Sequence, residues 1–140
     1  MLRSISMSEI LVILIIGGFY PVAIFYILSL QRALERCAPA SRSMPPVMAW
    51  LLLVPGFGWI WHFLIVIHMS KSLDSEFRLR SIPDFDPVAL RELGLAACIL
   101  PLGVTLSVLA PWAGLFALVA GLVCWVVYWM KITKYASELA

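Results

Sequence analysis

His62 and His68 are the two side chains of this sequence that are best suited to moving protons or binding a metal. Six residues turn a helix through about 600°, so the two rings point to different faces of one helix. A metal-binding pair on a helix needs a spacing of three or four residues, and we therefore expect no metal site. The plain interpretation is that His62 is hydrogen-bonded inside a bundle and that His68 lies at a membrane interface. Ionisable groups at membrane depth are costly and often functional, which makes His62 the leading candidate residue.

The cysteines and acidic residues add little further chemistry. The three cysteines, Cys37, Cys98 and Cys124, form no C-x-x-C pair, and an odd number with two in apolar segments argues against a disulfide framework. Glu9 stands at the start of an apolar segment, where an acid simply favours the helix dipole. No other acid lies within an apolar run, so a proton relay is poorly supported. We expect a non-enzymatic protein with no catalytic residues, no cofactor and no metal.

The composition decides the class of protein. The chain has 140 residues, of which 63% are hydrophobic and 13% charged, and its mean hydropathy is +1.00. A soluble domain averages about 45–50% apolar and about 25% charged residues, so this chain has too little charge to cover a soluble surface. Soluble enzymes, disordered chains and nucleic-acid-binding modules are therefore poor descriptions, and no nucleic-acid partner is expected. The sequence predicts a single transmembrane domain, residues 1–140, whose surroundings are the lipid bilayer.

Three stretches without charge define the elements that must position these side chains, namely 10–31, 43–70 and 93–130. A bilayer core of about 30 Å needs about 20 helical residues, so the first two stretches can each span once. The third, as one helix, would be about 57 Å long and must fold back, for which Pro111 provides the turn. The sequence therefore predicts an all-α membrane bundle of four segments, about 8–30, 45–68, 90–109 and 112–131, with a cytoplasmic amphipathic extension over 69–82.

The second segment is interrupted near its middle by Pro55, Gly56 and Gly58. These residues either kink a spanning helix or turn it back as a re-entrant hairpin. We favour the kink, because a turn at membrane depth leaves backbone polar groups unpaired. Both termini are then cytoplasmic, with seven of the ten Lys and Arg on that side. The hairpin instead puts the N-terminus outside and nine of the ten inside, which the positive-inside rule prefers. Labelling of Cys37, in the first loop, distinguishes the two.

Aromatic and small residues indicate how the segments pack. Trp59 and Trp61 lie deep in the second segment, where they fill the bundle or line an interface between subunits. Small residues at spacings of four let helix backbones approach closely. The tight turn at Pro111 makes the last two segments antiparallel neighbours, so their small-residue faces are expected to meet. The small residues are Gly94 and Gly103 on the third segment and Ala113, Ala117 and Gly121 on the fourth.

Three patches of Pro and Trp in apolar surroundings resemble a known kind of protein. They are Met44-Pro45-Pro46 with Trp50, Pro55 and Phe57, then Trp61-x-Phe63, and finally Cys124-Trp125-x-x-Tyr128-Trp129-x-Lys131. The chain, over about residues 10–135, is similar to small polytopic membrane proteins of bacteria that are described only as domains of unknown function. The resemblance implies a multi-pass protein of the bacterial inner (cytoplasmic) membrane, and it supplies no activity and no functional residue.

Two functions remain open at this point. The first is a non-enzymatic scaffold or accessory subunit that self-associates or joins a larger membrane complex, with a second copy or a membrane protein as its partner. Its support is the set of Trp-rich and small-residue faces. The alternative is an oligomeric channel or small transporter whose path runs near His62 and the break at Pro55, Gly56 and Gly58, because broken helices at membrane depth are able to bind ions.

Overall fold

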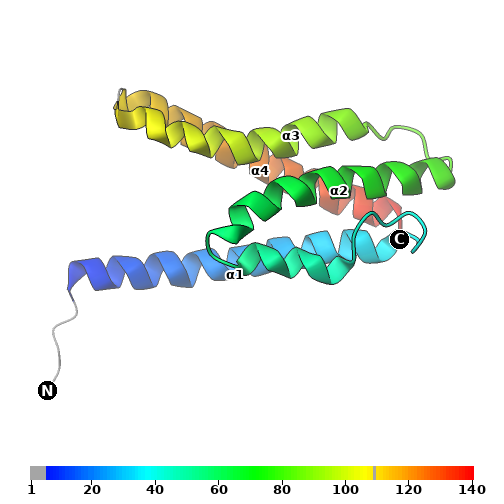
Figure 1. Cartoon of the computed structure of the whole chain (residues 1–140), viewed down its shortest axis with the longest axis horizontal. Coiled ribbons are helices and arrows are strands. Elements are labelled where there is room, and N and C mark those ends of the chain that lie inside the picture. Colours follow the sequence, from blue (N-terminus) through cyan, green and yellow to red (C-terminus); the bar gives the residue numbers. More distant parts are fainter. Residues whose placement is uncertain (1–5, 109) are drawn as a thin grey trace, which may run out of the picture.

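The computed structural model describes residues 6–108 and 110–140, and every element in these ranges is helical (Figure 1). The prediction of an all-helical chain is confirmed. Pro101 has no N–H to donate, and the third long element changes there from α-helix to a tighter 3-10 helix. The elements are α1 (Met7–Arg36), η1 (Pro46–Leu53), α2 (Phe57–Leu79), α3 (Pro87–Ile99), η2 (Leu100–Val108) and α4 (Pro111–Glu138).

Three helical stretches in the described part of the chain are long and apolar enough to cross a membrane. They are α1, the continuous α3–η2 stretch over Pro87–Val104, and α4. Their most apolar windows are only 11%, 22% and 17% buried inside the protein, so these helices show apolar side chains on the outside. Such surfaces suit lipid and not water, and they indicate a membrane protein. The predicted bundle of four spanning segments is not obtained, because the second segment is divided.

The chain reverses direction at Gly56, whose φ of +80° is a conformation that favours glycine. The two arms of the reversal, η1 and α2, lie antiparallel and bond to each other. The indole N–H of Trp61 donates to the carbonyl of Met48 in η1 at 2.9 Å, and in the loop before η1 the amide of Ser43 donates to the Ser72 hydroxyl of α2 at 2.8 Å. The prediction of a kinked helix is therefore wrong, because the chain turns back on itself as a hairpin (Figure 1).

Two backbone amides at the turn are paired within the hairpin. The Gly58 amide donates to the Val54 carbonyl at 2.7 Å, and the Val54 amide donates to the Leu51 carbonyl at 3.2 Å. Both arms keep helical hydrogen bonds almost to the tip. The cost of a turn at membrane depth is thus confined to the tip, where the first turn of α2 has no side-chain cap. The backbones cross so closely that a Cβ on Gly58 would collide with the Leu52 carbonyl.

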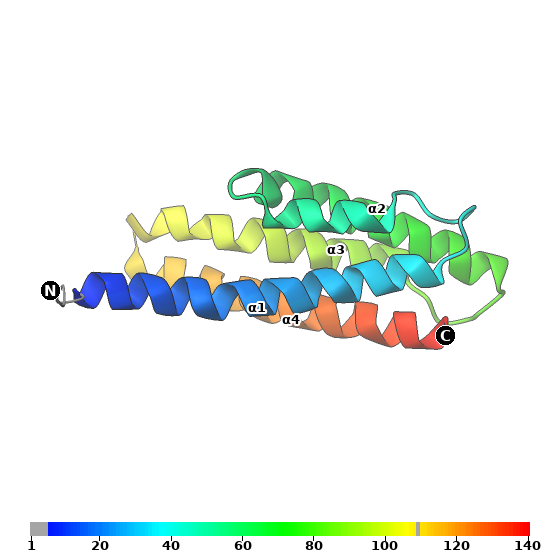
Figure 2. The same ribbon diagram turned by 90° about the horizontal axis from the view of Figure 1, so that it is seen from below.

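The hairpin changes the topology of the whole chain. Figure 1 shows the start of α1 and the end of α4 at opposite ends of the long axis, with both ends of the hairpin at the α4 end. This arrangement does not favour the expectation that both termini lie on one side of a membrane, which stays a prediction. In the view of Figure 2 the hairpin covers only part of the length of α3. At the α4 end of the molecule, which we call the five-stranded end, the chain passes in α1, η1, α2, α3 and α4. At the other end only α1, η2 and α4 continue.

Side chains that join helix ends are concentrated at the five-stranded end. Glu76 is 1% exposed and accepts from the Ala38 amide at 2.8 Å and from Arg80 Nε at 2.7 Å. Arg80 also donates to the carbonyls of Leu139, at 2.9 Å, and Arg36, at 3.2 Å. One carboxylate and one guanidinium thereby connect the ends of α1, α2 and α4. The predicted extension over 69–82 is helical as far as Leu79, and it packs on the bundle through this cluster.

Cys37 is part of the same packed end and is only 1% exposed. Burial, together with the nearby Glu76 carboxylate, raises the pKa of its thiol to about 11. A buried thiol with a raised pKa reacts poorly with maleimides, because the thiolate is the reactive form. Cys37 is therefore not a usable reporter of the side on which its loop lies.

We predict that Gly58→Ala destabilises the hairpin, since the new methyl group would collide with backbone at the crossing. The expected loss is about 1–3 kcal/mol, typical of overpacking. Gly17→Ala is the matched control, because nothing lies within 4 Å of a Cβ there. Thermal unfolding in detergent, followed by tryptophan fluorescence, should show a lower Tm for Gly58→Ala only. Equal melting of both variants would mean that the crossing is not as close as described.

We predict that the stability of the fold depends on pH through Glu76. Burial raises the pKa of Glu76, but hydrogen bonds from Ala38, Ser41 and Arg80 outweigh it, so the pKa lies below its usual value. The ionised form is therefore favoured in the fold. Its contribution to stability is complete above the unfolded-state pKa and is lost as the pH falls through the folded-state pKa.

Glu76→Gln should accordingly lower stability by about 1.5–3 kcal/mol at about pH 7, the value of a hydrogen bond to a charged group. Its Tm should approach that of the wild type once the medium is acidic enough to protonate Glu76. Glu138→Gln is the control, since its pair with Lys134 is a 3.7 Å surface contact of little value. A constant Tm difference between Glu76→Gln and the wild type at all pH values would contradict the assignment.

Candidate functional site

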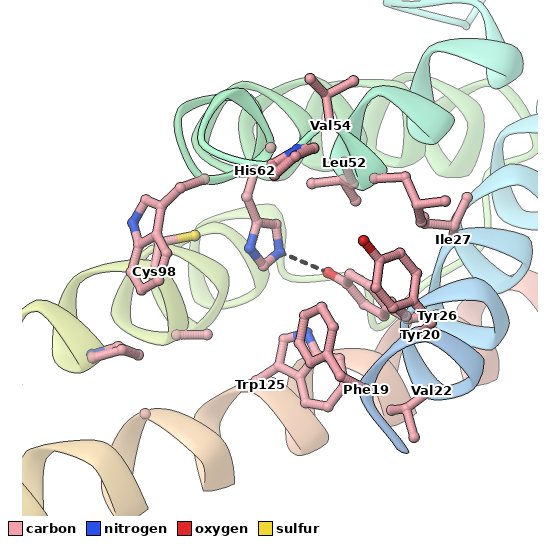
Figure 3. Close-up of a pocket in the computed structure, with 18 of the residues that line it drawn as sticks. Phe19, Tyr20, Val22, Tyr26, Ile27, Leu52, Val54, His62, Cys98 and Trp125 are labelled. Atoms are coloured by element: carbon pink, nitrogen blue, oxygen red, sulfur yellow. Dashed lines mark hydrogen bonds between the residues drawn. The ribbon is translucent and has the colours of Figure 1, made fainter. Parts of the chain in front are cut away.

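A cavity of about 660 Å³ lies beside the tip of the hairpin, between α1, α3 and α4. It exists because the hairpin ends part of the way along the bundle, while the three longer elements continue. Figure 3 shows side chains from α1, the hairpin and α4 pointing into this space. The wall is mainly apolar and aromatic, and it includes Phe19, Tyr20, Leu52, Trp59, Leu118 and Trp125.

The polar centre of the cavity is a pair formed by His62 of α2 and Tyr26 of α1. The Tyr26 hydroxyl and His62 Nε2 are 2.9 Å apart, and the two rings meet edge to face with centroids 5.7 Å apart (Figure 3). Tyr26 is 4% exposed, so its buried hydroxyl needs a hydrogen-bond partner of this kind. The other ring nitrogen of His62, Nδ1, makes no hydrogen bond with any residue that the structure describes.

An aromatic cluster closes one end of the cavity. The Tyr26 ring contacts Trp125 and Trp129, with centroids 5.1 and 5.7 Å apart, and the Trp129 indole donates to the Ser29 hydroxyl at 2.9 Å. These contacts hold α1 against α4. Beyond them, toward the five-stranded end, lies a core of fully buried side chains that leaves no room for a ligand. In the other direction α1 diverges from α3 and α4 (Figure 1). The core includes Leu30, Ile65, Val66, Tyr128 and Ile132.

The cavity wall carries no formal charge on the described residues that line it. Its groups with transferable protons are His62, the hydroxyls of Tyr20 and Tyr26, and the thiol of Cys98. A charged ligand would lose its hydration without gaining a counter-ion, which is costly in apolar surroundings. The arrangement suits a neutral, mostly apolar molecule, whose orientation is set by one or two hydrogen bonds.

Some of the candidate residues identified from the sequence line the cavity, and others lie outside it. Trp61 does not line the cavity, because its indole N–H bonds to Met48 and its ring stacks on Phe57 with centroids 5.5 Å apart. His68 is also outside it, with Nδ1 bonded to the Ser43 hydroxyl. The remaining candidates all line the cavity: His62, Pro55, Gly56, Gly58 and Trp59.

The small residues lie where α3, η2 and α4 approach one another. A Cβ on Gly103 would lie 2.8 Å from the Cβ of Ala117, and one on Gly94 would lie 2.8 Å from the Tyr128 ring. The contacts they make are therefore within one chain. Two more of the predicted residues complete the set: Gly121, which packs on Pro101, and Ala113, half-buried in the first turn of α4.

Tyr26 is the functional candidate that the sequence reasoning missed. Its hydroxyl is a polar group in a run without charges, which is a signal that it needs a partner. That partner, His62, is 36 residues away in the sequence. Only the reversal at Gly56 determines which face of α2 meets α1, so the pair was not readable from spacing along the chain.

Comparison with protein families, curated proteins and solved structures finds no match to this chain. Within residues 6–108 and 110–140, His, Cys, Asp and Glu do not gather in groups of three that could hold a metal ion. The cavity is therefore the feature of the described chain that best supports a functional hypothesis.

Proposed function

We propose that this chain is a non-enzymatic integral membrane protein that binds a lipophilic small molecule in the cavity beside the hairpin tip. The observation that carries the proposal is the cavity itself. Its volume of about 660 Å³ lies within the range of small-molecule sites. Its wall is apolar, and the polar pair of His62 and Tyr26 faces into it. This combination is typical of sites that take up a largely apolar ligand.

The role of an accessory subunit agrees with binding, because such a subunit would retain a lipophilic molecule for a membrane-protein partner. Self-association has less support than the sequence indicated. Gly94, Gly103 and Gly121 make their close contacts inside the chain, so their faces are not free for a second copy. A channel or transporter would use the same cavity. The packed core beyond Tyr26 and Trp129 favours binding over conduction through one chain.

We further infer that the five-stranded end faces the cytoplasm of a bacterial cell, with the membrane being the inner membrane. Nine of the ten Lys and Arg belong to segments at that end, as the positive-inside rule requires. Arg3 lies outside the described residues. In this orientation the cavity lies at mid-depth and opens away from the cytoplasm. The nine residues are Arg32, Arg36, Arg42, Lys71, Arg78, Arg80, Arg91, Lys131 and Lys134.

The orientation is tested with two new cysteines at exposed positions near opposite ends, Ser8→Cys and Ser75→Cys. A membrane-impermeant maleimide applied to intact spheroplasts should label Ser8→Cys and should reach Ser75→Cys only after lysis. The wild type serves as the control, because Cys37 and Cys98 are buried and Cys124 is half-buried in α4. The reverse pattern would invert the proposed orientation. Labelling of both variants in intact cells would contradict the re-entrant hairpin.

Binding is tested with a long-chain bromoalkane, which quenches tryptophan fluorescence on contact. Trp59 and Trp125 line the cavity, so purified protein in detergent should show a saturable quenching component. Ala23→Phe fills the cavity and should weaken that component by at least about tenfold, since there is little space for both the ring and the ligand. Val12→Phe adds the same ring on the exposed face of α1 and should leave it unchanged. Quenching that never saturates, or that is unchanged by Ala23→Phe, would refute the proposal.

A further inference from the structure

The hydrogen bond between His62 and Tyr26 has a preferred direction. A neutral imidazole ring has one nitrogen that donates and one that accepts. A phenol hydroxyl is a better donor than an imidazole N–H, and the bare ring nitrogen is a better acceptor than a phenol oxygen. Tyr26 therefore donates to His62 Nε2 across the 2.9 Å between them. The ring proton of His62 is then on Nδ1.

The Nδ1–H group of His62 has no acceptor among the described residues. His62 is half-buried and lines the cavity, so this donor is available to a molecule inside it. An unpaired donor in apolar surroundings is unfavourable, and a ligand that supplies an acceptor removes the penalty. The Tyr26 hydroxyl is already engaged with Nε2, which leaves Nδ1–H as the free donor of the pair. The ligand group that fits is an oxygen acceptor.

The residues that line the cavity indicate that this acceptor is uncharged. The described lining residues include no Lys or Arg to neutralise a carboxylate and no Asp or Glu to neutralise an amine. A carboxylate would face only aromatic rings, aliphatic groups and neutral donors. An uncharged carbonyl oxygen accepts a hydrogen bond from Nδ1–H and costs far less to bury. The aromatic rings of Phe19, Trp59 and Trp125 provide the surface for the rest of the ligand.

We propose that the cavity binds a neutral lipophilic carbonyl compound, with its carbonyl oxygen at His62 Nδ1 and its apolar body along the aromatic wall toward the region where α1 diverges from α4. The inference rests on the proposed function and names the ligand class for the same site. Quinones and lipid esters both carry such a carbonyl, and both are lipophilic enough to reach the cavity from the bilayer.

The test is competition against the bromoalkane by four probes of equal chain length: an alkane, its 2-ketone, its carboxylic acid and its amine. We expect the ketone to displace the bromoalkane at about tenfold lower concentration than the alkane, the value of roughly one net hydrogen bond. The acid and the amine should be the weakest competitors. A decyl-substituted benzoquinone and a fatty acid methyl ester are added as two further arms. Tighter competition by one of them identifies the source of the carbonyl.

The variants separate the hydrogen bond from general packing. His62→Phe keeps a ring of similar size without the donor, and the advantage of the ketone over the alkane should vanish. His62→Gln keeps an N–H donor and should retain part of that advantage. His68→Phe, outside the cavity, should leave it intact. Circular dichroism and Tm of each variant show that the fold is kept, and should His62→Phe fail to fold, the probe series on the wild type decides alone.

Each outcome separates the two proposals. Saturable quenching with equal competition by the ketone and the alkane overturns the carbonyl inference and leaves the lipophilic site in place. Tightest binding by the acid or the amine also overturns it, because the ligand would then be charged. The loss of saturable quenching in the wild type would overturn both. A ketone preference that survives in His62→Phe would show that another residue supplies the donor.

Discussion

The close crossing of backbones at Gly58 and Leu52 determines the rest of this structure. The chain turns back at Gly56, and the 2.7 Å bond from the Gly58 amide to the Val54 carbonyl pairs one amide of this turn. The reversal ends the hairpin part of the way along α1, α3 and α4. The cavity is the space beside the hairpin tip, where the longer helices continue beyond it. Without a glycine at the crossing there would be a longer turn, and no defined wall of this shape.

The opposite end of the hairpin is held by charge and not by close packing alone. Glu76 and Arg80 connect the end of α2 with carbonyls and amides at the ends of α1 and α4. Buried ionic groups of this kind are rarely a large net source of stability, but they require specific partners and so define one arrangement of the helix ends. A hairpin fixed at its base and closed at its tip has little freedom to tilt. His62 of this hairpin lies opposite Tyr26, with 2.9 Å between Nε2 and the hydroxyl.

The sequence was informative where a single physical rule dominates. Charge-free runs located the helices, Pro111 located the turn between the last two spans, and the Pro and Gly residues located the break in the second segment. The nature of that break required a comparison between two opposing effects, the charge rule and backbone pairing. Backbone pairing favours a kink, but each arm of the hairpin keeps its own helical hydrogen bonds, so only groups at the tip are affected by the turn. The His62–Tyr26 contact depends on the helix faces that meet after the reversal, and no local pattern contains that information.

The position of the aromatic cluster bears on what the cavity is suited for. A transport path would have to pass Tyr26, Trp125 and Trp129, whose rings contact one another and are held by the bond from Trp129 to Ser29. Opening a path would break this bond and separate α1 from α4 at their main contact, and it would also uncover the core beneath. A molecule that enters from the side of the bilayer where the helices diverge would therefore leave by the same route. Entry and exit on one side are typical of a protein that retains or presents a ligand, which agrees with the proposed binding role.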